Sequence, residues 1–104
     1  MNPGEFVIAY LRDPKERLFC RVERMDSLGL VLKGLDIGSF EDWVGQVTRG
    51  DEQVIQPSTF FIPMSRVERL MLDETAPRLP SFQDRFKQAV GVTLGEWLEP
   101  SRDQ

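Results

Sequence analysis

The chain has 104 residues, a formal net charge of −4 and a sequence pI of about 4.8. This length predicts one domain, or one domain with a small appendage. The acidic balance argues against a strongly basic nucleic-acid binder, because neutralising phosphates requires a basic surplus. Basic and acidic groups are nevertheless equal in number over residues 1–40, so a local basic patch remains open.

Two strands are predicted at the start of the chain. Residues 6–12 are apolar on both faces and contain β-branched and aromatic side chains, which is typical of a strand buried on both sides. After a turn, alternating residues predict a second strand with one face in the core and Phe19 on the other face. The core-facing residues of this strand are Leu18, Cys20 and Val22. The alternation breaks before Met25, which predicts a β-bulge near Glu23 or Arg24 that returns Met25 to the core and bends the strand.

Three more strands are expected further along the chain. Residues 28–35 form the third strand, and residues 59–62 and 67–72 form the fourth and fifth. Residues 36–57 hold glycines, acidic residues and isolated apolar residues, and we expect a long loop there with one helical turn that begins near Ser39. Five short strands separated by turns favour a small closed or nearly closed β-barrel.

The C-terminal part of the chain has helical signals. Residues 73–80 contain two prolines and are predicted to be a linker. Ser81 is the expected cap of a helix with an apolar face, which ends at Gly91. Thr93 is the expected cap of a second, shorter helix that Pro100 would stop. Helices this short do not fold alone, so residues 81–104 are expected to pack on the barrel.

The residue types that usually carry catalysis are scarce. The chain has no histidine, which removes the usual general base, the usual metal ligand and every Ser-His or Cys-His pair. The single cysteine, Cys20, is interpreted as a small buried hydrophobe. We therefore predict no enzyme activity, no catalytic or metal-binding residue and no cofactor. No apolar run is long enough to cross a membrane, and we expect a cytoplasmic protein.

One group of basic residues and one group of aromatic residues have two interpretations each. The basic residues are Arg21, Arg24, Lys33, Arg66 and Arg69. They form a solvated or ion-paired face, or they contact the backbone of single-stranded RNA. The aromatic residues are Phe40, Trp43, Phe60 and Phe61. They are core or subunit contacts, or they are platforms on which bases stack.

Two stretches of the chain resemble the Sm-like family, which includes the Sm and LSm proteins and bacterial Hfq. Residues 22–33 resemble the first family motif, in which a bent strand ends in an apolar residue and is followed by Asp26, a short turn and an apolar strand. Residues 61–70 resemble the second motif, two short strands joined by a tight turn. The resemblance covers roughly residues 7–72. It implies a strongly bent five-stranded barrel and a ring that assembles through the edges of strands four and five.

The family's RNA-binding residues carry over less well than its apolar spacing. The resemblance implies RNA contacts from an Asn in the first motif, where this chain has residues 27–29 as Ser-Leu-Gly. It also implies basic residues in the second motif, where residues 63–65 are Pro-Met-Ser and Arg66 is the nearest base. The resemblance therefore supports the fold more strongly than it supports RNA binding.

Together these observations predict a mainly β protein. Residues 1–72 would form a five-stranded, strongly bent Sm-like (SH3-type) open barrel, followed by the linker and by one or two short C-terminal α-helices. We expect a non-enzymatic homo-oligomer that mediates protein assembly or interaction, with residues 36–57 available to a protein partner. The expected oligomer interface consists of Phe60, Phe61, Ile62, Val67, Leu70 and Leu72. The alternative is a ring that binds single-stranded RNA through the basic and aromatic residues above.

Overall fold

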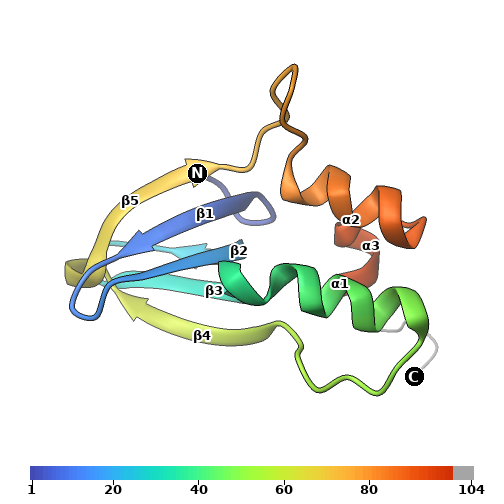
Figure 1. Ribbon diagram of the computed structural model, residues 1–104. Helices are drawn as coiled ribbons and strands as arrows, with labels where there is room; N and C mark the ends of the chain where they lie inside the picture. Colours follow the sequence, from blue (N-terminus) through green and yellow to red (C-terminus); the bar gives the residue numbers. More distant parts are fainter. Residues whose placement is uncertain (100–104) are drawn as a thin grey trace.

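The computed structural model describes residues 1–99 and shows a mixed α/β fold (Figure 1). A five-stranded antiparallel sheet has the strand order β4-β3-β2-β1-β5. The strands are β1 (Phe6–Leu11), β2 (Glu16–Met25), β3 (Gly29–Asp36), β4 (Ser58–Pro63) and β5 (Val67–Leu72). The helices are α1 (Phe40–Arg49), α2 (Phe82–Val90) and α3 (Leu94–Leu98), with single 3₁₀ turns η1 (Ile37–Ser39) and η2 (Met64–Arg66).

The sheet is open, so the expectation of a closed or nearly closed barrel is wrong. Among the described residues, β4 pairs only with β3 and β5 pairs only with β1. Closing a barrel requires a hydrogen-bonded ladder between the two outer strands, and these two strands do not form one. The outer edges of β4 and β5 therefore keep unpaired backbone groups.

The predicted β-bulge is confirmed, but its predicted effect on Met25 is wrong. The register between β2 and β3 shifts between Val22 and Arg24. Met25 then pairs with Leu30 at the end of the ladder, where its side chain is 38% exposed. The bulge restores the parity of Met25, but this residue ends the ladder at the tip of the β2–β3 hairpin, and its side chain remains partly exposed.

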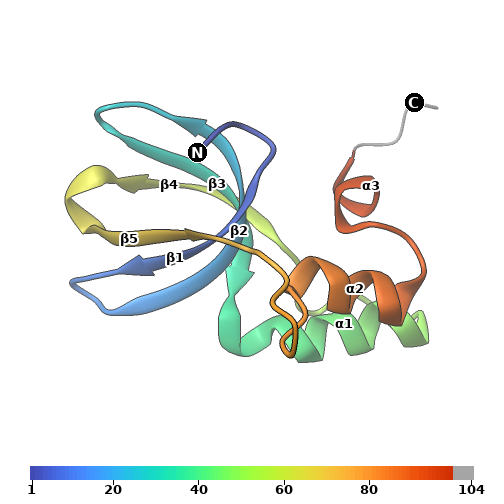
Figure 2. The same ribbon diagram turned by 90° about the horizontal axis from the view of Figure 1, so that it is seen from above.

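Both faces of the sheet carry an apolar core. The inner face bears the core residues Val7, Ala9, Leu11, Leu18, Cys20, Val22, Leu30, Leu32 and Ile62. The opposite face, called the helix face below, is covered at one end by the three helices (Figures 1 and 2). The helix-side core consists of Phe6, Phe19, Leu35, Phe40, Trp43, Val44, Phe86, Leu94 and Leu98. Phe19, expected away from the core, is therefore buried beneath the helices.

The predicted long loop at residues 36–57 is wrong, because residues 40–49 form the ten-residue helix α1. The helical turn expected near Ser39 is confirmed as the start of this longer helix. The apolar side chains of α1 recur at helical spacing and face the sheet. The helix ends at Gly50, whose φ of 71° suits a residue without a side chain. The following segment is tied back by Gln46, whose amide oxygen accepts from the Val54 and Ile55 N–H groups and whose amide nitrogen donates to the Ile55 carbonyl.

The caps predicted for the C-terminal helices are confirmed. The Ser81 hydroxyl accepts from the Asp84 N–H at the start of α2, and Thr93 and Glu96 form a reciprocal capping box at the start of α3. The segment 73–80, predicted as a linker, contains a tight turn in which Ala76 and Leu79 exchange backbone hydrogen bonds. Pro100, the expected stop of α3, lies outside the described residues.

Candidate functional site

The five predicted basic residues do not form one track. Four of them lie on the helix face, since Arg21 pairs with Lys33, Arg24 with Val31, and Arg69 with Tyr10. An apolar row runs between the Arg21–Lys33 pair and Arg69. That row consists of Leu35, Phe19, Ile8 and Met71. The structure therefore separates Arg69 from the others, and a single strand of phosphates has no continuous basic path across this face.

Several of these basic groups are already engaged within the chain. The Arg21 guanidinium lies 2.6 Å from the Glu23 carboxylate, and Arg24 lies 3.8 Å from Asp26. Arg66 donates to the carbonyls of Arg12 and Pro14 and forms an ion pair with a carboxylate of β2. Contacts of this kind fix the side chains and reduce the positive charge that is available to a polyanion.

The two sheet edges place the predicted interface residues differently. On β4, Phe61 is 51% exposed and Phe60 is half-buried, whereas Ile62 is buried in the inner core of its own chain. On β5, Val67 and Leu70 are half-buried and Leu72 is exposed. Sequence reasoning missed Met71, which is 43% exposed on the same edge. Each edge thus carries incompletely covered apolar side chains on both faces of the sheet.

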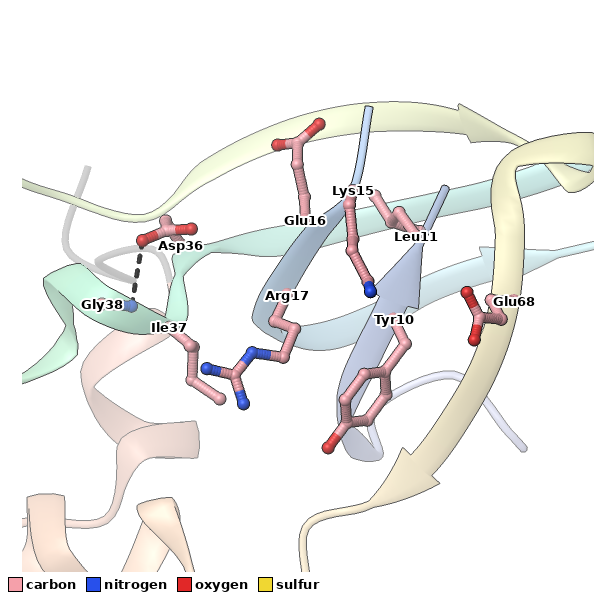
Figure 3. A pocket seen from close by; sticks show the side chains of 9 residues that line it. All are labelled: Tyr10, Leu11, Lys15, Glu16, Arg17, Asp36, Ile37, Gly38 and Glu68. Carbon is pink, nitrogen blue, oxygen red and sulfur yellow. Dashed lines mark hydrogen bonds between the residues drawn. The ribbon is translucent and has the colours of Figure 1, made fainter. Parts of the chain in front are cut away.

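A groove opens between the β1–β2 hairpin and η1 (Figure 3). It has a volume of about 540 Å³. Its lining consists of Tyr10, Leu11, Lys15, Glu16, Arg17, Asp36, Ile37, Gly38 and Glu68. Figure 3 shows the Arg17 side chain between Ile37 and Tyr10, with the Lys15 amine directed toward the same space. This groove was not predicted from the sequence.

The groove combines one aromatic ring with free cations. Arg17 pairs with Tyr10 across the hairpin, and Tyr10 pairs with Arg69 on the next strand. The Arg69 guanidinium carbon lies 4.4 Å from the centre of the Tyr10 ring, a cation–π distance. Within residues 1–99, none of Lys15, Arg17 and Arg69 forms an ion pair.

The signal for this groove was present in the sequence but needed the strand register. Tyr10 and Arg17 lie on either side of the predicted turn, and pairing the two strands about that turn places them opposite each other. Arg69 joins them only because β5 adds to β1 rather than to β4. That choice of neighbour is a long-range property that local alternation does not determine.

Other candidate reactive groups are buried or absent from the described part. Burial raises the pKa of the Cys20 thiol to about 12, so it is neutral and unreactive at physiological pH. The Trp43 indole N–H is buried without a hydrogen-bond partner. Residues 1–99 contain no cluster of three or more metal-ligating side chains. Across the same residues, every helix is too short or too polar to cross a membrane.

Comparison of the chain with protein-family models, with curated proteins and with solved structures gives no match.

Proposed function

We propose that this protein is a non-enzymatic assembly module whose copies associate through the outer edges of β4 and β5. The observation that carries the proposal is the pair of unpaired edges, each flanked by apolar side chains that the chain itself leaves partly uncovered. An exposed sheet edge is a template for adding another strand.

Each outer edge carries apolar residues on both faces of the sheet, which supports the addition of a strand to either edge. Phe60 and Phe61 are consecutive on β4, so they point to opposite faces of the sheet. Met71 and Leu72 have the same relation on β5. A strand added to either edge would bury apolar surface on both faces, and main-chain hydrogen bonds would supply the rest of the affinity.

The Sm-like resemblance points to the same interface. It implies contacts between copies through strands four and five, and these are the two outer strands of the sheet. The two ends of each copy are different edges, so repeated β4-to-β5 pairing is head-to-tail and closes into a ring if the rotation per copy permits. We therefore propose a ring of identical copies, located in the cytoplasm as the sequence predicts.

Two other roles are less well supported. Single-stranded RNA binding is weakened because Arg21 and Arg66 already form ion pairs with carboxylates. A protein partner at residues 36–57 would meet α1, whose apolar side chains already pack against the sheet. Its exposed acidic residues Glu41 and Asp42 leave a solvated surface that basic partners would fit.

Light scattering coupled to gel filtration at micromolar concentration tests the proposal. We expect the wild-type mass to be a multiple of one chain. Phe61→Lys alters the β4 edge and Met71→Lys alters the β5 edge, and either variant should shift the mass toward a single chain, because a buried unpaired ammonium is costly. Val54→Lys is the matched control, since Val54 is 82% exposed and lies off both edges.

A wild-type protein with the mass of one chain would refute the assembly proposal. Equal dissociation by Val54→Lys would also refute it, because the effect would then come from net charge and not from the edges. Circular dichroism of each variant checks that the fold is retained. Titration of the wild type with short RNA at low salt tests the alternative, and saturable, salt-dependent binding would favour it.

A further inference from the structure

The groove at the β1–β2 hairpin has the size that a small ligand needs. Its volume of about 540 Å³ falls within the usual range of small-molecule sites, roughly 300–1,000 Å³. Its walls come from the hairpin, from η1 and from β5 (Figure 3). Lys15 and Arg17 belong to the hairpin and not to either outer strand, so a ligand here does not require association of copies.

The free charge in the groove is positive, although the whole chain has a net charge of −4. Of the three carboxylates in the lining, that of Glu16 lies 2.8 Å from the Arg66 guanidinium. That of Asp36 accepts from the Gly38 N–H at 2.9 Å. Asp36 keeps its negative charge when it accepts this hydrogen bond, so Asp36 and Glu68 are the acids of the lining that stand against Lys15 and Arg17. Arg69 stacks on the lining residue Tyr10 and adds a third cation, and within residues 1–99 none of the three cations forms an ion pair.

The cations have two different positions: Lys15 and Arg17 point into the groove, and Arg69 stacks on the Tyr10 ring. Arg69 stacks on Tyr10 and fixes one side of the groove. Lys15 and Arg17 are two residues apart at the entry to β2 and point into the same space. A guanidinium presents a planar set of donors that matches two oxygens of a phosphate, and an ammonium adds a compact second charge.

We infer that this groove binds a phosphate monoester of mononucleotide size. Arg17 and Lys15 hold the phosphoryl group, whose charge of about −2 near neutral pH matches the two positive charges of these side chains. Ile37 and Tyr10 supply apolar surface on opposite sides of Arg17, and a planar ring lies against one of these two surfaces. A ligand with a single carboxylate would leave one of the two cations unpaired. Inorganic phosphate would pair with both cations but would leave the apolar side chains exposed to water.

Isothermal titration of the full chain with adenosine monophosphate, adenosine and inorganic phosphate tests this site. We expect saturable binding of adenosine monophosphate, weaker binding of inorganic phosphate and no binding of adenosine. Arg17→Gln and Lys15→Gln should each weaken adenosine monophosphate about tenfold or more, because each removes a charge-assisted contact. Arg24→Gln is the matched control, since it removes the same charge from an exposed side chain of the same strand outside the groove.

Three results would overturn the inference. One is the absence of saturable binding of adenosine monophosphate at millimolar concentration. Another is an equal loss in Arg24→Gln, because binding would then follow overall charge. The third is equal affinity for inorganic phosphate and adenosine monophosphate, because the ring would then contribute nothing. Backbone amide shifts of Arg17 and Ile37 in a nuclear magnetic resonance titration should accompany the heat, and shifts confined to other residues would place the ligand elsewhere.

Discussion

Asp73 joins the outer strand of the sheet to the first turn of α2. It follows β5 directly, and its N–H donates to the Phe6 carbonyl at 2.9 Å. Its buried carboxylate accepts from the Phe82 N–H at 2.9 Å and from the Gln83 N–H at 3.0 Å. The Gln83 side-chain amide donates to the same carboxylate at 3.1 Å. These backbone donors at a helix start have no partner within the helix, so the carboxylate satisfies them and lies at the positive end of the helix dipole.

We predict that Asp73→Ala lowers the free energy of unfolding by about 2–4 kcal/mol. Hydrogen bonds to a charged group contribute about 1.5–3 kcal/mol each, and loss of a helix cap costs about 0.5–2 kcal/mol when water replaces it. The sum is less than additive because the opened turn admits water. Asp73→Asn keeps one oxygen acceptor but loses the charge, so we expect a smaller loss of about 1–2 kcal/mol.

Urea denaturation followed by tryptophan fluorescence and far-ultraviolet circular dichroism measures these differences. The slope of free energy against urea should not change, because the surface exposed on unfolding is the same. Glu74→Ala is the control: it removes a carboxylate from the next, exposed position and should change stability by less than about 0.5 kcal/mol. If Asp73→Ala were as stable as Glu74→Ala, the reasoning about the helix start would be wrong.

Three further predictions use the same assay. Gly34→Ala should lower the free energy of unfolding by at least about 2 kcal/mol, because its new Cβ would lie 2.1 Å from the Phe19 carbonyl oxygen. Gly95→Ala, whose new Cβ would have no heavy atom within 4 Å, should be neutral or stabilising. Equal effects of the two substitutions would contradict the close approach at Gly34. Phe86→Ala should cost about 3–5 kcal/mol, since the ring is fully buried, and a loss below about 1 kcal/mol would show that the helix-side core is loose. Burial raises the pKa of Cys20 from 9.0 to about 12, so its contribution is intact below pH 9 and is lost as the pH rises toward 12. Cys20→Ala should therefore lose less stability than the wild type between these values, and identical pH dependence would contradict this.

Local signals explain which parts of the fold the sequence predicts. Strands β1, β3 and β5 have apolar spacing and turn residues that act within a few positions, and all three lie close to their predicted ranges. The caps Ser81 and Thr93 likewise act on backbone groups within three residues. Such features depend on neighbours along the chain, so one sequence is enough to find them.

Helix α1 shows what local signals miss. Glycine and acidic residues in this stretch indicate a loop, and Ser39 makes no side-chain cap for the helix. Its apolar residues Phe40 and Trp43 stabilise the helix by packing against Phe19 and Phe86, respectively, which lie far from them in the sequence. Tertiary packing of the amphipathic face therefore stabilises a helix that capping signals alone do not predict.

The candidate site was predicted only in part, for a related reason. Arg69 was singled out as a basic residue, but its partners Tyr10 and Arg17 were not. Which strand lies beside β1 decides whether these three side chains meet, and the sequence leaves that choice open. Counting charges in the sequence also does not show which of them are paired: Arg66 forms an ion pair with Glu16, whereas Lys15 forms none within residues 1–99.

Strand β2 contributes side chains to both apolar cores. Cys20 and Val22 supply the inner core, while Phe19 supplies the helix-side core. Deleting one residue from this part of β2 would exchange the side chains between the two faces of the sheet. Phe19 would then point into the inner core, and Cys20 would lie beneath the helices. Beyond the β-bulge that follows Val22, β2 pairs only with the start of β3, at the tip of the hairpin. Changes in chain length should therefore be tolerated beyond that point and be fatal to folding just before it.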